Sequence, residues 1–219
     1  MLCFGPYDKQ LSGSPGRAVF LVYCLLRWRQ NLAIVTTRSI IWERLDYPGH
    51  EASRVEQRQN GWFLQGTAVF HFERQPCRLD YTIQCDHEWR TEEVTVDGWL
   101  GNDVVRHEIT VDSSRRWHFD GRARSDLEGC VDVDLGFSPL TNTLPIRRLT
   151  LEIGASAQVC AAWLPVPGFE LRPLEQVYSR LDVSRYRYES GGGRFAADLD
   201  VDAEGLVIEY PGFWRLLQA

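Results

Sequence analysis

From Ser39 onward, apolar and polar residues alternate in short runs along most of the chain. Leu79, Tyr81 and Ile83 occupy every second position of one run, and residues 130–135 alternate just as regularly. A period of two places successive side chains on opposite faces of a β-strand. The pattern therefore predicts a series of strands, each with one face in a core.

Turn-forming residues separate these runs at close intervals. Pro48-Gly49, the triple glycine at 191–193 and Asn60-Gly61 are examples, and Asn-Gly is a strong hairpin signal. A last hairpin is expected around residues 203–205. No window carries a long apolar stripe of period 3.6 with caps. The sequence predicts an all-β sandwich, barrel or roll.

Two segments of the second half are less regular. Residues 147–155, "RRLTLEIGA", place Leu149, Leu151 and Ile153 on one face and predict a strand. Residues 173–181 alternate imperfectly after Pro173, and we consider a helix there. No shift in composition divides 38–219, which we interpret as one domain.

Residues 1–37 differ from the rest of the chain. The apolar run at 18–26 is too short to cross a bilayer, which needs about 20 residues. Arg27 and Arg29 follow it, where a signal peptide has small residues. We predict no integral membrane segment and interpret 1–37 as an N-terminal appendage or the product of a start codon placed too far upstream. A short helix on a membrane surface is the alternative.

The composition is that of an ordinary soluble protein, with 44% hydrophobic and 25% charged residues. The net charge of −6 argues against nucleic acid as a partner. The six cysteines include no C-x-x-C pair, so we expect reduced thiols and a cytoplasmic location. A Cys77–Cys85 disulfide is the alternative. The sequence does not specify an oligomeric state.

Motifs for metals, nucleotides and nucleophilic catalysis are missing. Asp198, Asp200 and Asp202 imitate a calcium loop, but Ala203 stands where the sharp turn needs glycine. The histidines have no ligand spacing, and the glycine-rich phosphate loops and G-x-S-x-G are absent. We therefore expect no metal and no cofactor.

The segment 130–149, "CVDVDLGFSPLTNTLPIRRL", carries the most unusual charges. Strand geometry places Asp132 and Asp134 on one face. Arg147 and Arg148 point to opposite faces if they lie in a strand, so only one of them readily reaches the aspartates.

Three functions for these charges compete. An arginine forks onto Asp132 or Asp134 and locks the sheet, which is the alternative that we prefer. An arginine faces a cavity and binds an anionic or polyhydroxyl headgroup. The two aspartates act as an acid–base pair, as in glycoside hydrolysis, although residues of one strand share one environment.

The same segment resembles the bacterial family described as putative glycolipid-binding. "GWFLQGTAVF", "LDYTIQCDHEWRTEEV", "EQVYSRLDVSRYRYES" and "FAADLDVDAEGLVIEYPGFW" also match that family, from about Ile40 to Phe213. The resemblance implies a single-domain antiparallel spiral β-roll, similar to the carriers that ferry lipoproteins across the periplasm. It implies no catalytic residues. It marks these candidate binding residues: Asp132, Asp134, Thr141, Asn142, Thr143, Arg147, Arg148, Gln176 and Tyr178.

The resemblance thus predicts a non-catalytic protein that holds a lipid or glycolipid in a curled sheet. An apolar hollow in such a sheet could take acyl chains, and tryptophan rings could stack on sugars. The candidate rings, each of which could equally be a core residue, are Trp62, Trp89, Trp99, Trp117 and Trp163. The alternatives are a hydrolase that uses Asp132, Asp134 and an arginine, and a module that docks partners at its sheet edges.

Overall fold

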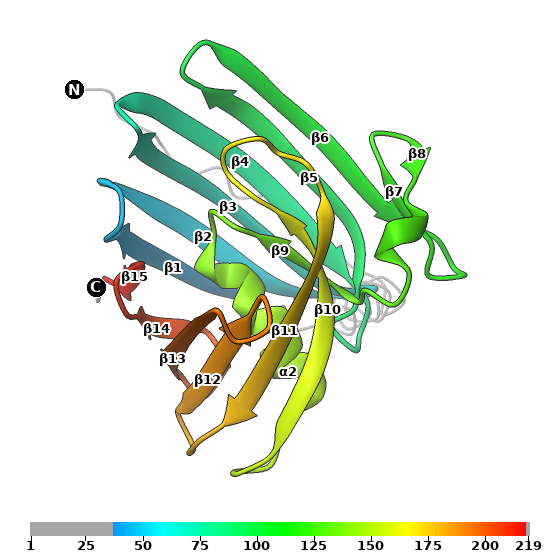
Figure 1. Cartoon of the computed structure of the whole chain (residues 1–219), viewed down its shortest axis with the longest axis vertical. Coiled ribbons are helices and arrows are strands. Elements are labelled where there is room, and N and C mark those ends of the chain that lie inside the picture. Colours follow the sequence, from blue (N-terminus) through cyan, green and yellow to red (C-terminus); the bar gives the residue numbers. More distant parts are fainter. Residues whose placement is uncertain (1–36, 218–219) are drawn as a thin grey trace, which may run out of the picture. The chain divides into compact units, whose positions relative to one another are not determined.

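Fifteen strands join into one sheet in the computed structural model, which describes residues 37–217 (Figure 1). The strands are β1 (Thr37–Arg44), β2 (Gly49–Arg58), β3 (Gly61–Phe72), β4 (Gln75–Cys85), β5 (Thr91–Leu100), β6 (Asp103–Val111), β7 (Trp117–Phe119), β8 (Arg122–Ala123), β9 (Asp132–Leu135), β10 (Ser156–Leu164), β11 (Arg172–Arg180), β12 (Arg185–Ser190), β13 (Phe195–Val201), β14 (Val207–Tyr210) and β15 (Trp214–Leu216). Three short helical segments accompany them: η1 (Ser125–Leu127), η2 (Pro139–Asn142) and α2 (Thr143–Leu149).

The sheet consists of two halves that meet where β1 pairs with β15. The first half runs outward from β1 to β8, and the second half runs back from β9 to β15. Neighbouring strands are antiparallel, except that β9 runs parallel to β10. The predicted hairpins at residue 61 and around residues 203–205 are confirmed.

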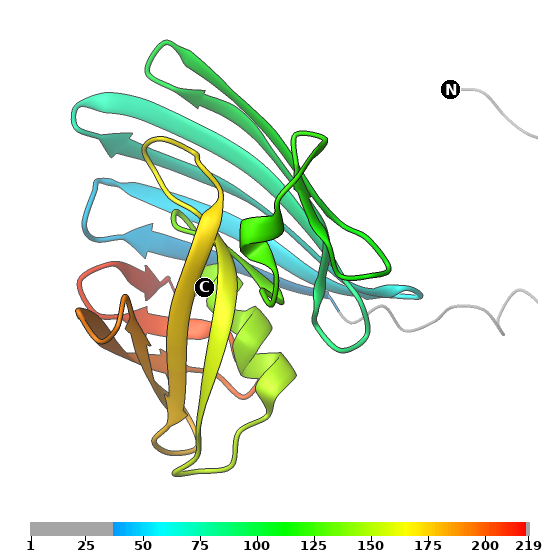
Figure 2. The ribbon, with the colours of Figure 1, turned by 45° about the vertical axis from the view of Figure 1, so that its right-hand side comes forward.

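The sheet is open, with β8 and β9 as its two edges, and it is neither closed nor strongly curled (Figures 1 and 2). The expectation of a mostly β antiparallel domain is confirmed. The resemblance also implied that the sheet curls into a spiral roll, and the observed sheet is less strongly curled than that.

Two expectations for the second half of the chain are wrong. The predicted strand at 147–155 is not formed, because residues 143–149 form the helix α2 and β10 begins only at Ser156. Thr150 ends the helix in the left-handed region at φ 43°. Pro145 is tolerated because it lies in the first turn, where backbone N–H groups have no helical acceptor. The candidate helix at 173–181 is instead part of β11, with Pro173 near the start of the strand, where a missing N–H does least harm.

The core follows the predicted alternation. In β4, Leu79, Tyr81, Ile83 and Cys85 are at most 2% exposed, while their neighbours reach the other face. One large cluster of buried side chains joins the first half of the sheet to β9, η2 and α2, and a smaller cluster lies among β10–β14. The inner side of the sheet is thus filled with side chains.

Residues 37–217 also bear on the expectations for disulfides, metal sites and membrane segments. Cys77 and Cys85 are free thiols, so the alternative disulfide is not formed. Asp198 and Asp200 lie in β13 and pair with arginines. Nowhere in this range do three His, Cys, Asp or Glu side chains gather as a metal site would require. None of the helices described here has the length and apolar character to span a membrane. The expected appendage, 1–37, lies outside the described residues apart from Thr37, which begins β1.

Candidate functional site

The segment 136–149, named here the bridging segment, connects the two halves of the sheet from its inner side (Figures 1 and 2). It contains η2 and α2. Ser138 begins η2 and accepts a hydrogen bond from the Leu140 N–H at 3.2 Å, which satisfies one free donor of the first turn. The Ser138 hydroxyl also donates to Glu51 of β2, and Arg148 binds Asp132 of β9.

Arg148 forms the lock that the sequence favoured. Its Nε and Nη2 donate to the two carboxylate oxygens of Asp132 at 3.0 and 2.6 Å. Asp132 is only 1% exposed. Burial raises the pKa of Asp132, and the bonds and charge of Arg148 oppose that shift. A bidentate pair of this kind fixes the angle of α2 against β9.

Asp134 lies on the same face of β9 but has a different partner. Gln176 of β11 donates from Nε2 to Asp134 Oδ2 at 2.6 Å. Burial raises the pKa of Asp134 to about 6, which the Gln176 bond partly offsets. Both oxygens of Asp132 are thus held by Arg148, whereas Asp134 is bound by Gln176 alone among the described side chains, so the two aspartates have different surroundings.

Most of the other candidate residues with a hydroxyl or amide side chain hydrogen-bond to groups of the bridging segment. The Tyr178 hydroxyl donates to Asn142 Oδ1 at 2.9 Å, and Thr141 Oγ1 donates to the Ser138 carbonyl at 3.1 Å. Thr143 differs, because its hydroxyl is buried and has no hydrogen-bond partner among the residues described.

Arg147 points away from the aspartates into a separate hollow, named here the arginine–tryptophan pocket. This pocket of about 150 Å³ is lined by Arg38, Val55, Trp62, Trp89, Thr143, Arg147, Glu204 and Leu206. The rings of Trp62 and Trp89 stack with centroids 4.2 Å apart. The Arg147 guanidinium carbon lies 5.3 Å from the Trp89 centroid and 6.0 Å from that of Trp62. Within 37–217, no carboxylate forms an ion pair with Arg147.

Trp89 is held in this pocket by an unusual backbone. Its φ of +66° lies in the left-handed region, which bulky residues rarely adopt. Asp86 stabilises the turn, because its carboxylate accepts from the N–H groups of Glu88 and Arg90, each at 2.9 Å. Such strained residues cluster at binding sites, where surrounding contacts fix them.

The other candidate tryptophans have different surroundings. Trp117 is 1% exposed in the core, and its indole N–H donates to the Cys130 carbonyl. Trp99 is 36% exposed on the outer face of β5. Trp163 of β10 lines a second, larger hollow.

Sequence reasoning missed the buried acid Glu51. Glu51 is 0% exposed, and its Oε1 accepts from the hydroxyls of Tyr81, Ser138 and Ser53 at 2.5, 2.6 and 2.7 Å. Its Oε2 has no partner in the described part of the chain. Burial raises the pKa of Glu51 to about 7, against the opposing effect of the three hydroxyls and Arg44. The alternation in β2 places Glu51 on the same inward face of the strand as Val55, and this pattern could have identified Glu51 as a buried acid.

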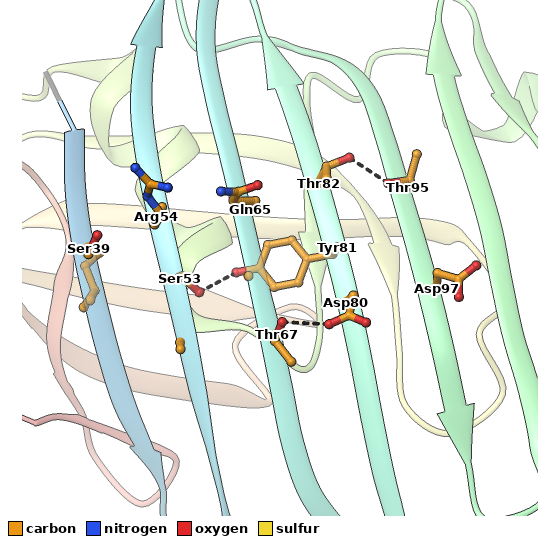
Figure 3. Close-up of a pocket in the computed structure, with 13 residues that line it drawn as sticks. Ser39, Ser53, Arg54, Gln65, Thr67, Asp80, Tyr81, Thr82, Thr95 and Asp97 are labelled. Atoms are coloured by element: carbon orange, nitrogen blue, oxygen red, sulfur yellow. Dashed lines mark hydrogen bonds between the residues drawn. The ribbon is translucent and has the colours of Figure 1, made fainter. Parts of the chain in front are cut away.

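Gly66 makes room for this network. A Cβ there would lie 2.4 Å from Ser53 Oγ and 2.5 Å from the Tyr81 hydroxyl oxygen. Glycine therefore lets the Tyr81 side chain cross β3 and reach Ser53 on β2 (Figure 3).

A wider hollow of about 520 Å³ crosses β1 to β5 and is drawn in Figure 3. Its polar side chains largely satisfy one another. Thr67 donates to Asp80, and the hydroxyls of Thr82 and Thr95 are 2.7 Å apart. We therefore place the candidate site at the arginine–tryptophan pocket. Arg38 and Glu204 of its lining bind each other, but Arg147 and the Thr143 hydroxyl have no polar partner among the described residues.

Comparison with known proteins agrees with the resemblance. The model of the family described as "Putative glycolipid-binding" matches residues 39–216. The chain is similar to a DUF1089 family protein from Pseudomonas aeruginosa, known from a crystal structure, with 34% identity and a TM-score of 0.69. The match covers 76% of this chain and 92% of that one. No curated protein matches the chain. The chain belongs to the family described as putative glycolipid-binding.

Proposed function

We propose that this protein binds the polar headgroup of a glycolipid without transforming it, and that Arg147 is the anchor. The observation that carries the proposal is the position of Arg147. It lies over two stacked tryptophans in a pocket and, unlike Arg148, pairs with no carboxylate within residues 37–217.

The chemistry of the pocket suits a headgroup that combines hydroxyls with an anionic group. A guanidinium presents several fixed N–H donors, which match phosphate or carboxylate oxygens and also reach sugar hydroxyls. Tryptophan rings offer apolar faces to the C–H face of a sugar. The unpartnered hydroxyl of Thr143 costs about 1–3 kcal/mol while it stays unsatisfied, so a ligand that binds it recovers that energy.

The size of the pocket limits what it encloses. Its volume of about 150 Å³ is below the roughly 300–1,000 Å³ typical of pockets that enclose a whole small ligand. The inner side of the sheet is packed, with Leu64, Leu140 and Leu144 at 0% exposure. We therefore propose recognition of part of the headgroup, with the acyl chains outside this core.

The hydrolase alternative is less well supported. It needs Asp132 to be available to a substrate, and Asp132 is buried and bound through both oxygens.

We also propose that the protein works in a reducing compartment such as the cytoplasm. The proposal is supported by four free cysteines, Cys77, Cys85, Cys130 and Cys160.

Titration with glycerophosphoinositol tests the proposal, because this soluble headgroup combines a phosphate with a polyhydroxyl ring. We expect saturable binding that Arg147→Ala weakens about tenfold or more, since the anchoring donors are lost. Arg106→Ala is the matched control, because Arg106 is exposed on the outer face and pairs with Asp97. Equal affinities of the wild type and Arg147→Ala would remove Arg147 as the anchor.

A further inference from the structure

A second hollow, named here the aromatic cleft, lies on the other side of the bridging segment. It measures about 320 Å³ and is formed by residues from β9 to β15. Asn142 lines this cleft, whereas the next residue, Thr143, lines the arginine–tryptophan pocket. The rings that line the cleft are those of Trp163, Tyr188, Phe195, Tyr210, Phe213 and Trp214.

Among the described residues that line the cleft, Asp134 is the one acid, and none is Arg, Lys or His. Its carboxylate receives a hydrogen bond from Gln176 but forms no ion pair within 37–217. The nearby Arg148 is bound to Asp132, whose charge adds to the negative potential at Asp134. With a pKa of about 6, Asp134 is mostly ionised at neutral pH. The cleft therefore contains a desolvated negative charge without a counter-ion among its lining residues.

The rings around Asp134 strengthen this preference for positive charge. Tyr210 lies 5.1 Å from Phe213 and 6.3 Å from both Tyr188 and Phe195, between ring centroids, and these pairs are tilted or edge-on rather than stacked. The faces of aromatic rings carry negative potential and attract cations. Trp163 and Trp214 already have arginines over their rings, Arg172 at 4.5 Å and Arg44 at 5.1 Å.

Three classes of ligand would fare differently in such a cleft. An anion is repelled by Asp134 and by the ring faces. A neutral sugar gains hydrogen bonds but leaves the charge of Asp134 uncompensated. A cation gains from both the carboxylate and the rings, since a buried charge is costly until it is paired.

We propose that the aromatic cleft binds a quaternary ammonium group, with Asp134 as its counter-ion and the tyrosine and phenylalanine rings as its walls. This site is separate from the arginine–tryptophan pocket and does not depend on the function proposed for Arg147.

Choline chloride is the probe, added to the full chain at neutral pH. Enclosure by aromatic rings shifts the methyl proton resonance of choline upfield, so NMR detects both binding and its site. We expect saturable binding that is weakened about tenfold or more by Asp134→Asn, which removes the counter-ion. Asp97→Asn, on the outer face of β5, is the matched control and should leave binding unchanged.

A second variant tests the cleft independently, in case Asp134→Asn does not fold. Tyr210→Leu keeps the charge and removes one ring, so it should weaken binding and reduce the upfield shift. Arg147→Ala should leave choline binding unchanged, which separates this site from the headgroup anchor. Absence of choline binding to the wild type would overturn the proposal. So would glucose binding that depends on Asp134 and excludes choline, because it would assign the cleft to neutral sugars.

Discussion

The buried acid Glu51 makes the stability of the protein depend on pH in a way that one substitution should remove. Burial raises the pKa of Glu51 from 4.5 to about 7 in the folded protein, while the unfolded chain keeps the ordinary value. The folded state thus binds this proton more tightly than the unfolded state does. Its stabilising effect is complete below the unfolded pKa and is lost as the pH rises through the folded pKa.

The size of the effect follows from the shift. The rise of the Glu51 pKa from 4.5 to about 7 corresponds to about 3 kcal/mol in the free energy of unfolding, because a tenfold change in proton affinity is worth about 1.36 kcal/mol. Glu51→Gln keeps an acceptor for the three hydroxyls and has no charge to desolvate. The variant should therefore match the wild type at about pH 4.5 and exceed its stability by about 3 kcal/mol above pH 7.

Urea unfolding followed by tryptophan fluorescence measures this difference across the pH range. Asp134 also has a raised pKa, but it is present in both proteins, so the difference between their curves isolates Glu51. Parallel pH dependence of the wild type and Glu51→Gln would show that Glu51 does not titrate as its burial requires.

Two further substitutions test the packing of the bridging segment. Arg148→Ala leaves the carboxylate of Asp132 buried and uncompensated, so it should lower the free energy of unfolding by about 3 kcal/mol, whereas Arg148→Met combined with Asp132→Leu should restore most of that loss in a denaturant titration. If the double variant is as unstable as the single one, the pair does not act as a lock. Gly66→Ala forces a Cβ against Ser53 and Tyr81 and should cost about 1–3 kcal/mol, and an unchanged thermal midpoint would contradict the close packing there.

Much of the fold could be predicted because a strand with one buried face alternates apolar and polar residues. Runs such as 79–85 alternate with period two, and their burial in β4 follows that alternation. The helix α2 was missed because its seven residues are too few to display a period of 3.6. Pro173 weakened the strand pattern of β11, although the start of a strand tolerates proline.

The different contacts of Arg147 and Arg148 could be predicted only in part. That just one of them reaches Asp132 was expected, but from strand geometry. In α2, successive side chains are about 100° apart, so Arg148 turns toward β9 while Arg147 faces Trp62 and Trp89. Two of the three hydroxyls that bind Glu51 come from Tyr81 and Ser138, which lie 30 and 87 positions away, and no local pattern contains that information.

The indole N–H resonances of the tryptophans can show whether Arg147 receives a ligand while Arg148 holds the bridging segment in place. These signals, assigned with Trp→Phe variants, are followed during titration with glycerophosphoinositol. We expect the Trp62 and Trp89 resonances to shift with the same saturation curve, while those of Trp117 in the core and Trp163 in the aromatic cleft stay in place. Shifts confined to Trp163, or no shift at Trp62 and Trp89 at saturation, would contradict this expectation.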